Sequence, residues 1–186
     1  MSQQLSQNPM ARYILRYMDD TVSIRFAIPD DAPHIWQFIC DLAEYEHGRD
    51  HVRITPDIIK AQLESAHPPF ECLIAEWRNE AIGFALFCKK YSTWEGCQTL
   101  WLEDIYVKPR FRRHNHAGVS VGRFLLNQLQ KIACERGYGR IEWWVLNWNE
   151  PAIRFYESLG AHPMNEWTVW RINPEAPPQP RQRVSK

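Results

Sequence analysis

The sequence lacks an excess of charge of either sign. Lysine and arginine together number 22, as do aspartate and glutamate, so the 186 residues carry no net charge at neutral pH. A chain without such an excess has no overall field that attracts nucleic acid or an anionic membrane. We therefore expect neither nucleic acid nor a membrane as a partner.

Cysteine pairs and long apolar runs are also missing. The five cysteines include no Cys-x-x-Cys pair, and three of them stand inside apolar runs, which is typical of reduced core thiols in a cytoplasmic protein. No apolar run approaches membrane-spanning length, and residues 1–20 lack the basic start and apolar stretch of a signal peptide. We expect a cytoplasmic protein.

What the sequence does contain is enough for one domain. Its hydrophobic content of 45% can bury a sizeable core. We expect an N-terminal extension at residues 1–20 and one domain at residues 21–172. Residues 173–186, with four prolines, are expected to form a disordered tail.

The hydrophobic patterns predict alternating strands and helices. Apolar and polar residues alternate, or apolar residues run together, in strands expected at 22–27, 72–77, 81–89, 98–107, 141–146 and 166–172. Helices that begin with a capping residue are expected after Asp30 or Asp31, at Thr55-Pro56 and at Asn149, and a further helix is expected from about Ser120 to Arg136. With a hairpin turn at residues 78–80, the expected order is β-α-α-β-β-β-α-β-α-β.

Three segments carry a resemblance to a known family. They are Leu-Ala-Glu-Tyr-Glu at 42–46, Leu-Glu-Asp-Ile-Tyr-Val at 102–107, and Trp-Asn-Glu-Pro at 148–151 with Phe155-Tyr156 following. In this order the chain resembles the GNAT N-acetyltransferase superfamily and is most similar to spermidine/spermine (diamine) N-acetyltransferases, over roughly residues 22–172. The resemblance implies an α/β (α+β) fold with a mixed, mostly antiparallel central sheet flanked by helices, and a homodimer.

The same resemblance implies an activity. The protein is expected to move an acetyl group from acetyl-CoA, its co-substrate, to the primary amine of a small diamine or polyamine. Backbone groups of Ile105, Tyr106 and Val107 are expected to pair with the pantetheine arm, as an added strand does at a sheet edge. The further residues assigned to acetyl-CoA are Arg112, Arg113, Gly118, Ser120, Val121, Gly122, Arg123 and Asn149.

The loop assigned to the pyrophosphate departs from the family pattern. It is several residues longer, and Ser120 stands where glycine is usual. The loop also holds His114 and His116, but two histidines one residue apart without a neighbouring carboxylate or cysteine make a poor ligand set. We expect no metal.

Two residues are assigned to proton transfer. Tyr156 is the expected general acid for the departing thiolate, because a phenol with an ordinary pKa of about 10 is protonated at neutral pH. Glu103 is the expected general base, acting on the amine through water, and Asp104 is expected on the opposite face of the strand. The alternatives are a packing role for Tyr156 and a surface ion pair for Glu103.

An acceptor that is a cation calls for a negative, aromatic pocket. The residues assigned to it are Tyr45, Glu46, Trp94, Asp104, Glu166 and Trp167. Ser92 stands where the family often has an acidic residue, which favours a shorter diamine. Trp101, Trp143, Trp144 and Trp170 fall in strand patterns and are expected in the core or at a dimer interface.

Two other functions stay open at this point. The acceptor amine can belong to an amino acid, an aminoglycoside-like molecule or a protein terminus. The lengthened loop and Ser120 also allow a CoA-binding protein that has lost catalysis.

Overall fold

The computed structural model describes residues 12–15, 22–112 and 119–172. The chain divides into two compact units, with the boundary after Leu146. The first unit holds strands β1 (Arg12–Leu15), β2 (Val22–Phe26), β3 (Glu71–Trp77), β4 (Glu80–Ser92), β5 (Cys97–Val107) and β6 (Ile141–Glu142), and helices α1 (Ala32–Tyr45), α2 (Pro56–Leu63) and α3 (Val121–Glu135). The second unit holds α4 (Glu150–Glu157).

The strands of the first unit form one mixed sheet in the order β1-β2-β3-β4-β5-β6. Neighbours are antiparallel from β1 to β5, whereas β6 runs parallel to β5 and pairs only with Leu100 and Trp101. This confirms the expected mixed, mostly antiparallel sheet. β1 adds a strand that the sequence patterns did not predict.

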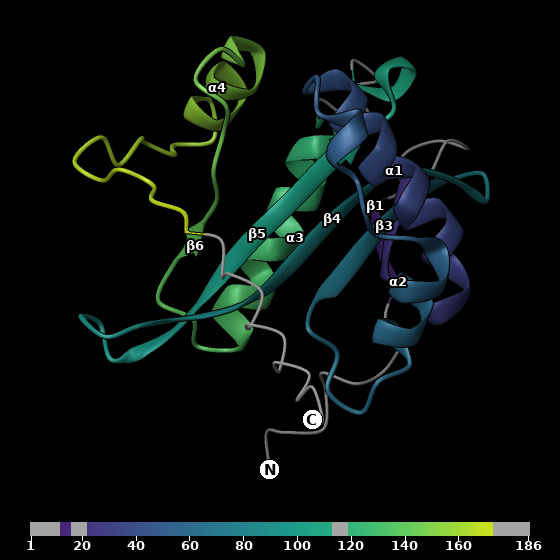
Figure 1. The fold of residues 1–186 in the computed structure, drawn as a ribbon, viewed down its shortest axis with the longest axis horizontal. Coiled ribbons are helices and arrows are strands. Elements are labelled where there is room, and N and C mark those ends of the chain that lie inside the picture. The colour runs from purple at the N-terminus through teal and green to yellow at the C-terminus, as the bar shows by residue number, and fades with distance from the viewer. Residues whose placement is uncertain (1–11, 16–21, 113–118, 173–186) are drawn as a thin grey trace, which may run out of the picture. The chain divides into compact units, whose positions relative to one another are not determined.

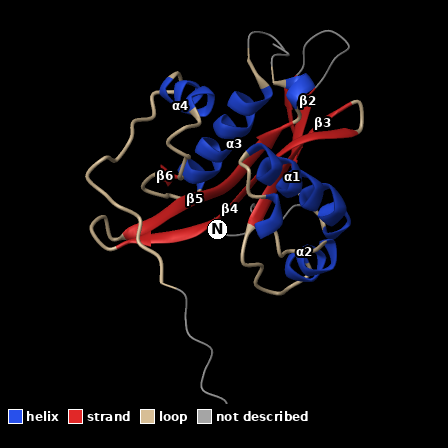
Figure 2. Ribbon diagram, turned by 45° about the horizontal axis from the view of Figure 1, so that its top comes forward, coloured by secondary structure: helices blue, strands red, loops and turns tan. Residues whose placement is uncertain are grey.

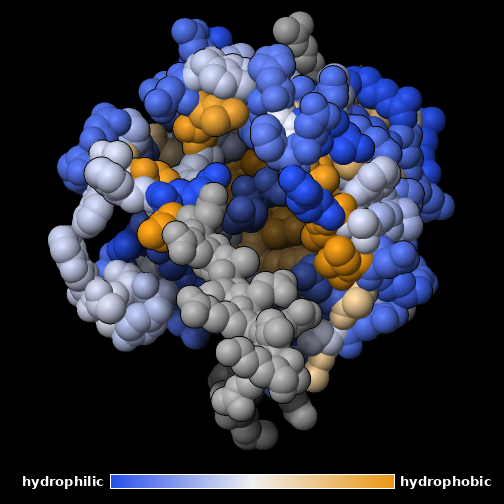
Figure 3. All heavy atoms as spheres, viewed as in Figure 1, coloured by the Kyte–Doolittle hydropathy of each residue, from blue (hydrophilic) through white to orange (hydrophobic). Residues whose placement is uncertain are grey.

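Helices cover both faces of this sheet, with α1 and α2 on one face and α3 on the other (Figure 1, Figure 2). Under α1 and α2 lies a cluster of buried side chains that includes Phe38, Ile59, Ile74, Phe84 and Tyr106. The rings of Phe38 and Phe84 stack with centroids 5.5 Å apart. The outward surface over α1 and α2 is mainly hydrophilic (Figure 3), so these helices are amphipathic and bury one side only.

Local sequence signals explain where the helices begin. The Thr55 and Ser120 side chains accept hydrogen bonds from the amides of Ile58 and Arg123, which caps α2 and α3. In the second unit Asn149 caps α4 in the same way, through the amide of Ala152. The Thr55 and Asn149 caps were predicted from the sequence, whereas Ser120 was predicted only as the approximate start of its helix. All three caps satisfy amides that a helix leaves unpaired in its first turn.

Two positions fix the β3–β4–β5 meander. Arg78 and Asn79 both have positive φ, 49° and 65°, as a two-residue hairpin turn requires. The turn is one residue shorter than the predicted 78–80, because Glu80 already pairs with Trp77. Gly83 lies opposite Val107, and a Cβ atom added at Gly83 would stand 2.6 Å from the carbonyl oxygen of Tyr106. Only glycine therefore allows β4 and β5 this close approach.

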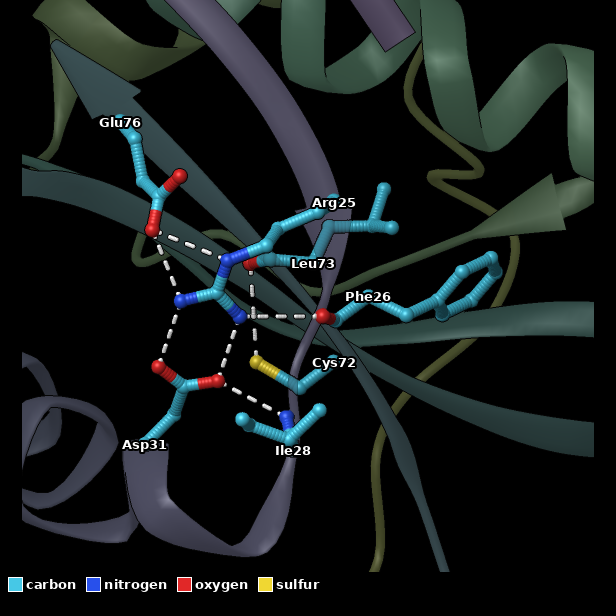
Figure 4. Close-up of polar contacts among 7 residues, drawn as sticks. All are labelled: Arg25, Phe26, Ile28, Asp31, Cys72, Leu73 and Glu76. Carbon is cyan, nitrogen blue, oxygen red and sulfur yellow. Dashed lines mark hydrogen bonds and ion pairs between the residues drawn. The ribbon is translucent and has the colours of Figure 1, made fainter. Parts of the chain in front are cut away.

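A largely buried ion network ties β2 to β3 and to the start of α1 (Figure 4). Arg25 donates to both carboxylate oxygens of Asp31, at 2.5 and 2.7 Å, and to Glu76 at 2.9 Å. The amide of Ile28 donates to Asp31 as well, at 2.8 Å. Asp31 thus joins β2 to the start of α1 through its side chain, although that side chain does not cap the helix.

The prediction of a last strand at residues 166–172 was wrong. These residues lie outside any helix or strand, and Trp170 and Ile172 are 90% and 92% exposed. A strand is defined by pairing with a neighbour, which an alternating pattern alone does not supply. β6 is likewise shorter than predicted, and the exposed Trp144 shows that its pattern does not mark a core position.

Cysteines only partly follow the expectation of buried thiols. All five are free, but only Cys40 and Cys72 are buried, and Cys134 is exposed.

Candidate functional site

A β-bulge on β5 decides how the two predicted carboxylates lie. Leu86 of β4 pairs with Asp104, and the next residue, Phe87, pairs with Leu102, so Glu103 is an extra residue in the ladder. The structure therefore corrects the expectation that Glu103 and Asp104 alternate to opposite faces. Strand alternation holds only where no bulge intervenes.

Both carboxylates lie on the α1 face of the sheet. Asp104 pairs with Leu86, which belongs to the core cluster under α1. Two residues further along β4, Cys88 pairs with Trp101, so Trp101 shares that face. The indole Nε1 of Trp101 donates to Oε2 of Glu103 at 2.7 Å, which places the Glu103 side chain there too.

The environment of Asp104 disfavours a negative charge. Burial raises its pKa to about 6, and the neighbouring charges of Glu103 and Glu46 act in the same direction. Burial also raises the pKa of Glu46, which follows the last residue of α1. The end of α1 and the bulge thus bring together three carboxylates. A bound cation would stabilise the charged forms of two of them, Glu46 and Asp104.

Arg112 joins the α1 end to the end of β5. Its guanidinium carbon lies 5.3 Å from the ring centroid of Tyr45 and 5.2 Å from that of Tyr106. Its Nε also donates to the carbonyl oxygen of Val107 at 2.8 Å. Arg112, assigned from the sequence to the cofactor, therefore has defined contacts inside the first unit and fixes the position of Tyr45 beside the carboxylates.

The edge of β5 is open where the pantetheine arm was predicted. β6 pairs with Leu100 and Trp101 only, and in the described part of the chain the strand pairs of Ile105, Tyr106 and Val107 are all with β4. An extended chain of amides can add to such an edge by main-chain hydrogen bonds.

The start of α3 fits the predicted anion site in part. Ser120 caps the helix, so its oxygen satisfies the amide of Arg123, whereas Val121 and Gly122 occupy the first positions of the helix. Amides there have no acceptor within the helix and attract anions. The serine that replaces the usual glycine is thus compatible with a helix N-terminus. Arg113 and Gly118 lie outside the described residues, as do His114 and His116.

Trp94 lies at the tip of the β4–β5 hairpin and is 87% exposed. Ser92, buried at the base of the same tip, accepts a hydrogen bond from the amide of Glu95 through its hydroxyl. The serine that stands in place of an acidic anchor therefore stabilises the turn.

The second unit carries the remaining predicted residues. Asn149 is buried and caps α4, and Tyr156 is the last residue but one of this helix, with its ring centroid 5.4 Å from that of Phe155. Glu166 and Trp167 lie in the irregular segment after α4 and are exposed.

Sequence reasoning missed the side chains beside Glu103. Trp101 contacts Trp144 edge to face, at 5.0 Å between ring centroids, and Lys90 lies over the Trp101 ring at 4.8 Å. With Cys88, Lys89 and Glu103 they line an open pocket of about 400 Å³. That Lys90 and Trp101 lie on the same face of the sheet can be recognised only when the hairpin register is known.

The described residues offer neither a metal site nor a membrane span. No group of three or more histidine, cysteine, aspartate or glutamate side chains there is arranged to hold a metal ion. No helix in those ranges has the length and apolar character needed to cross a membrane.

Comparison with known proteins agrees with this geometry. Residues 32–161 match the acetyltransferase (GNAT) family. A thialysine N-epsilon-acetyltransferase from Sus scrofa is 34% identical over 167 residues, which cover 84% of this chain and 95% of that protein. The spermidine/spermine N(1)-acetyltransferase-like protein 1 of Homo sapiens is 30% identical over 166 residues, or 84% of this chain and 23% of that protein.

The fold is shared with solved acetyltransferases. An aminoglycoside N-acetyltransferase in complex with CoA superposes with a TM-score of 0.64 at 20% identity, covering 85% of this chain and 99% of that one. GNAT enzymes use acetyl-CoA as their acetyl donor. Because the family match spans most of the chain and the pig relative is similar over nearly its whole length, this protein belongs to the GNAT family and is an N-acetyltransferase.

Proposed function

We propose that this enzyme transfers the acetyl group of acetyl-CoA to a terminal primary amine of a small diamine or polyamine. The observation that carries the proposal is the group of carboxylates on the α1 face, Glu46, Glu103 and Asp104, beside an open edge of β5. A cation entering this group would stabilise the charged form of Asp104, which burial and the charges of Glu103 and Glu46 disfavour. An ammonium group is such a cation.

Acetyl-CoA is proposed to lie along the open edge of β5. Its pantetheine amides would pair with Ile105, Tyr106 and Val107, and its pyrophosphate would meet the amides of Val121 and Gly122 at the start of α3. Arg112, Arg113, Gly118, Ser120 and Arg123 flank that anion site in the sequence. Asn149 is proposed to contact the cofactor near the thioester while capping α4.

The reaction needs three proton transfers. Glu103, through water, takes a proton from the ammonium, and the free amine nitrogen attacks the thioester carbonyl carbon. The C–S bond breaks, and Tyr156 gives its proton to the leaving thiolate. The second proton of the attacking nitrogen returns through water to the Tyr156 phenolate, which leaves a neutral amide. Tyr45, Glu46, Asp104 and Trp94 are proposed to hold the acceptor, with Glu166 and Trp167 as further contacts. A homodimer remains a prediction.

The function is tested with a panel of amine acceptors, and turnover is measured as the release of free CoA. Diamines and polyamines should be turned over, and peptides with free N-termini should not. A preference for peptides would overturn the proposal.

The test of the proton donor is Tyr156→Phe. We expect kcat to fall by about 10²–10³-fold, the range of general acid catalysis. Calorimetric titration should find the affinity for acetyl-CoA within about twofold of the wild type, because the phenol acts on the leaving group. Tyr138→Phe, in the loop after α3, is the matched control and should leave kcat unchanged. Unchanged turnover in Tyr156→Phe would remove this residue from the mechanism.

A second candidate acceptor is the side-chain amine of an amino acid. It is favoured by the similarity to a thialysine N-epsilon-acetyltransferase. This acceptor also carries two amines, and differs from a diamine by a carboxylate.

A further inference from the structure

The open pocket beside the bulge continues the proposed acceptor site along the sheet. It is lined by Cys88, Lys89, Lys90, Trp101, Glu103 and Trp144 and has a volume of about 400 Å³. Glu103 belongs both to this pocket and to the carboxylates proposed to receive the amine. A small acceptor whose reacting amine lies at Glu103 therefore has its far end in this pocket or near it.

The Lys90 ammonium occupies the position in this pocket that would suit the second ammonium of a diamine. Its Nζ lies 4.8 Å from the centroid of the Trp101 ring and 3.3 Å from Oε2 of Glu142. An aromatic face with a carboxylate beside it is the combination that binds alkylammonium groups. Here a lysine of the chain itself fills that position.

The Trp101 indole separates the two charges. Its Nε1 donates to Glu103 at 2.7 Å, and its ring carries the Lys90 ammonium. The negative and the positive end of the pocket thus both contact the Trp101 side chain. A short chain of methylenes spans the distance between them. An acceptor that is positive at the reacting end and negative at the far end matches both charges.

We infer that Lys90 is a specificity-determining residue that selects acceptors whose far end carries a carboxylate. The inference rests on the proposed transfer to a terminal amine and favours the second candidate acceptor, a diamino acid, over a diamine of the same length. A second ammonium would meet the like charge of Lys90, whereas a carboxylate would find the Lys90 N–H donors that the hydrogen bond to Glu142 leaves. Lys90 touches only the far end of the acceptor and takes no part in proton transfer.

The experiment compares acceptors that differ only by a carboxylate. These are lysine against 1,5-diaminopentane, and ornithine against 1,4-diaminobutane. The quantity measured is the ratio of kcat/KM for the amino acid to kcat/KM for the diamine. Wild type, Lys90→Gln, Lys90→Glu and Lys90→Arg are compared, with Lys131→Gln on the exposed surface of α3 as the charge-matched control.

The expected result is a wild-type ratio above one. It should fall about three- to fivefold in Lys90→Gln and about tenfold in Lys90→Glu, as expected for a half-exposed charge. Lys90→Arg and Lys131→Gln should keep the wild-type ratio. A wild-type preference for the diamine, or ratios unaltered by Lys90→Glu while both acceptors are turned over, would overturn the inference. Loss of turnover on every amine would instead contradict the proposed function.

Discussion

Asp31 and Asp104 are both removed from water, yet their carboxylates behave in opposite ways. Burial alone would raise the pKa of Asp31, but hydrogen bonds from Arg25 and the Ile28 amide outweigh it and lower that pKa. For Asp104 burial, Glu103 and Glu46 all raise the pKa, to about 6.

The difference lies in what the fold places next to each carboxylate. Around Asp31, β2 supplies the Arg25 guanidinium in bidentate geometry, and the network holds β2, β3 and the start of α1 together (Figure 4). Around Asp104, the bulge and the end of α1 supply more carboxylates. A structural aspartate is stabilised by its own chain, whereas the charge of Asp104 is best stabilised by a ligand, as in many functional sites.

Removing the cation from the Asp31 network should have the largest effect. Arg25→Met leaves two carboxylates without their guanidinium, at side chains that are 6% and 14% exposed in Asp31 and Glu76. We expect the free energy of unfolding to fall by about 3–5 kcal/mol, as measured by urea unfolding at pH 7. The wild type should lose stability as the pH falls below about 4, because the folded pKa of Asp31 is lowered. That loss should be weaker in the variant.

A surface ion pair provides the control for this variant. Lys131→Ala, which removes an exposed pair with Glu135, should cost no more than about 0.5 kcal/mol. A similar small cost in Arg25→Met would mean that the two aspartates do not differ as described.

Neutralising Asp104 should raise the free energy of unfolding, whereas Arg25→Met should lower it. The folded pKa of Asp104 is raised to about 6, so the charged carboxylate destabilises the folded state above that pH. The destabilisation is about 1.4 kcal/mol for each tenfold decrease of the acid dissociation constant on folding. Asp104→Asn should therefore raise the free energy of unfolding by about 1–2 kcal/mol at pH 8. The gain should shrink as the pH falls from 6 towards 4, and kcat/KM for the amine should fall. A loss of stability at pH 8 would contradict the raised pKa.

The pH dependence of activity gives the finest test. The ratio of kcat/KM in the wild type to that in Asp104→Asn cancels the titration of the amine itself. This ratio should rise about tenfold per pH unit below the pKa of Asp104, which is about 6, and level off above it. A flat ratio between pH 5 and pH 8 would show that the charge of Asp104 plays no part in binding the acceptor.

Much of the fold followed from local signals in the sequence. Thr55 and Asn149 were recognised as caps because a cap depends only on residues within one turn. The turn at Arg78 and Asn79 was found in the same way, since it joins two neighbouring strands. The residue motifs around Glu103 and Tyr156 were enough to indicate the family.

What could not be predicted depends on partners distant in the chain. The bulge at Glu103 arises from how β5 aligns with β4, and no residue of the β5 motif signals it. Residues 166–172 have the alternation of a strand, but alternation supplies no neighbour to pair with. The contact of Lys90 with Trp101 likewise needed the hairpin register.

Gly83 is a position at which substitution would affect the edge of β5 proposed for acetyl-CoA. It lies behind the part of β5 proposed for acetyl-CoA, in contact with the Tyr106 carbonyl and the Val107 backbone. A side chain at Gly83 would stand too close to that backbone, so β4 and β5 would have to shift relative to each other. In a saturation mutagenesis screen, substitutions here would therefore present as defects in cofactor use, although the residue belongs to the opposite strand and offers no group to bind anything.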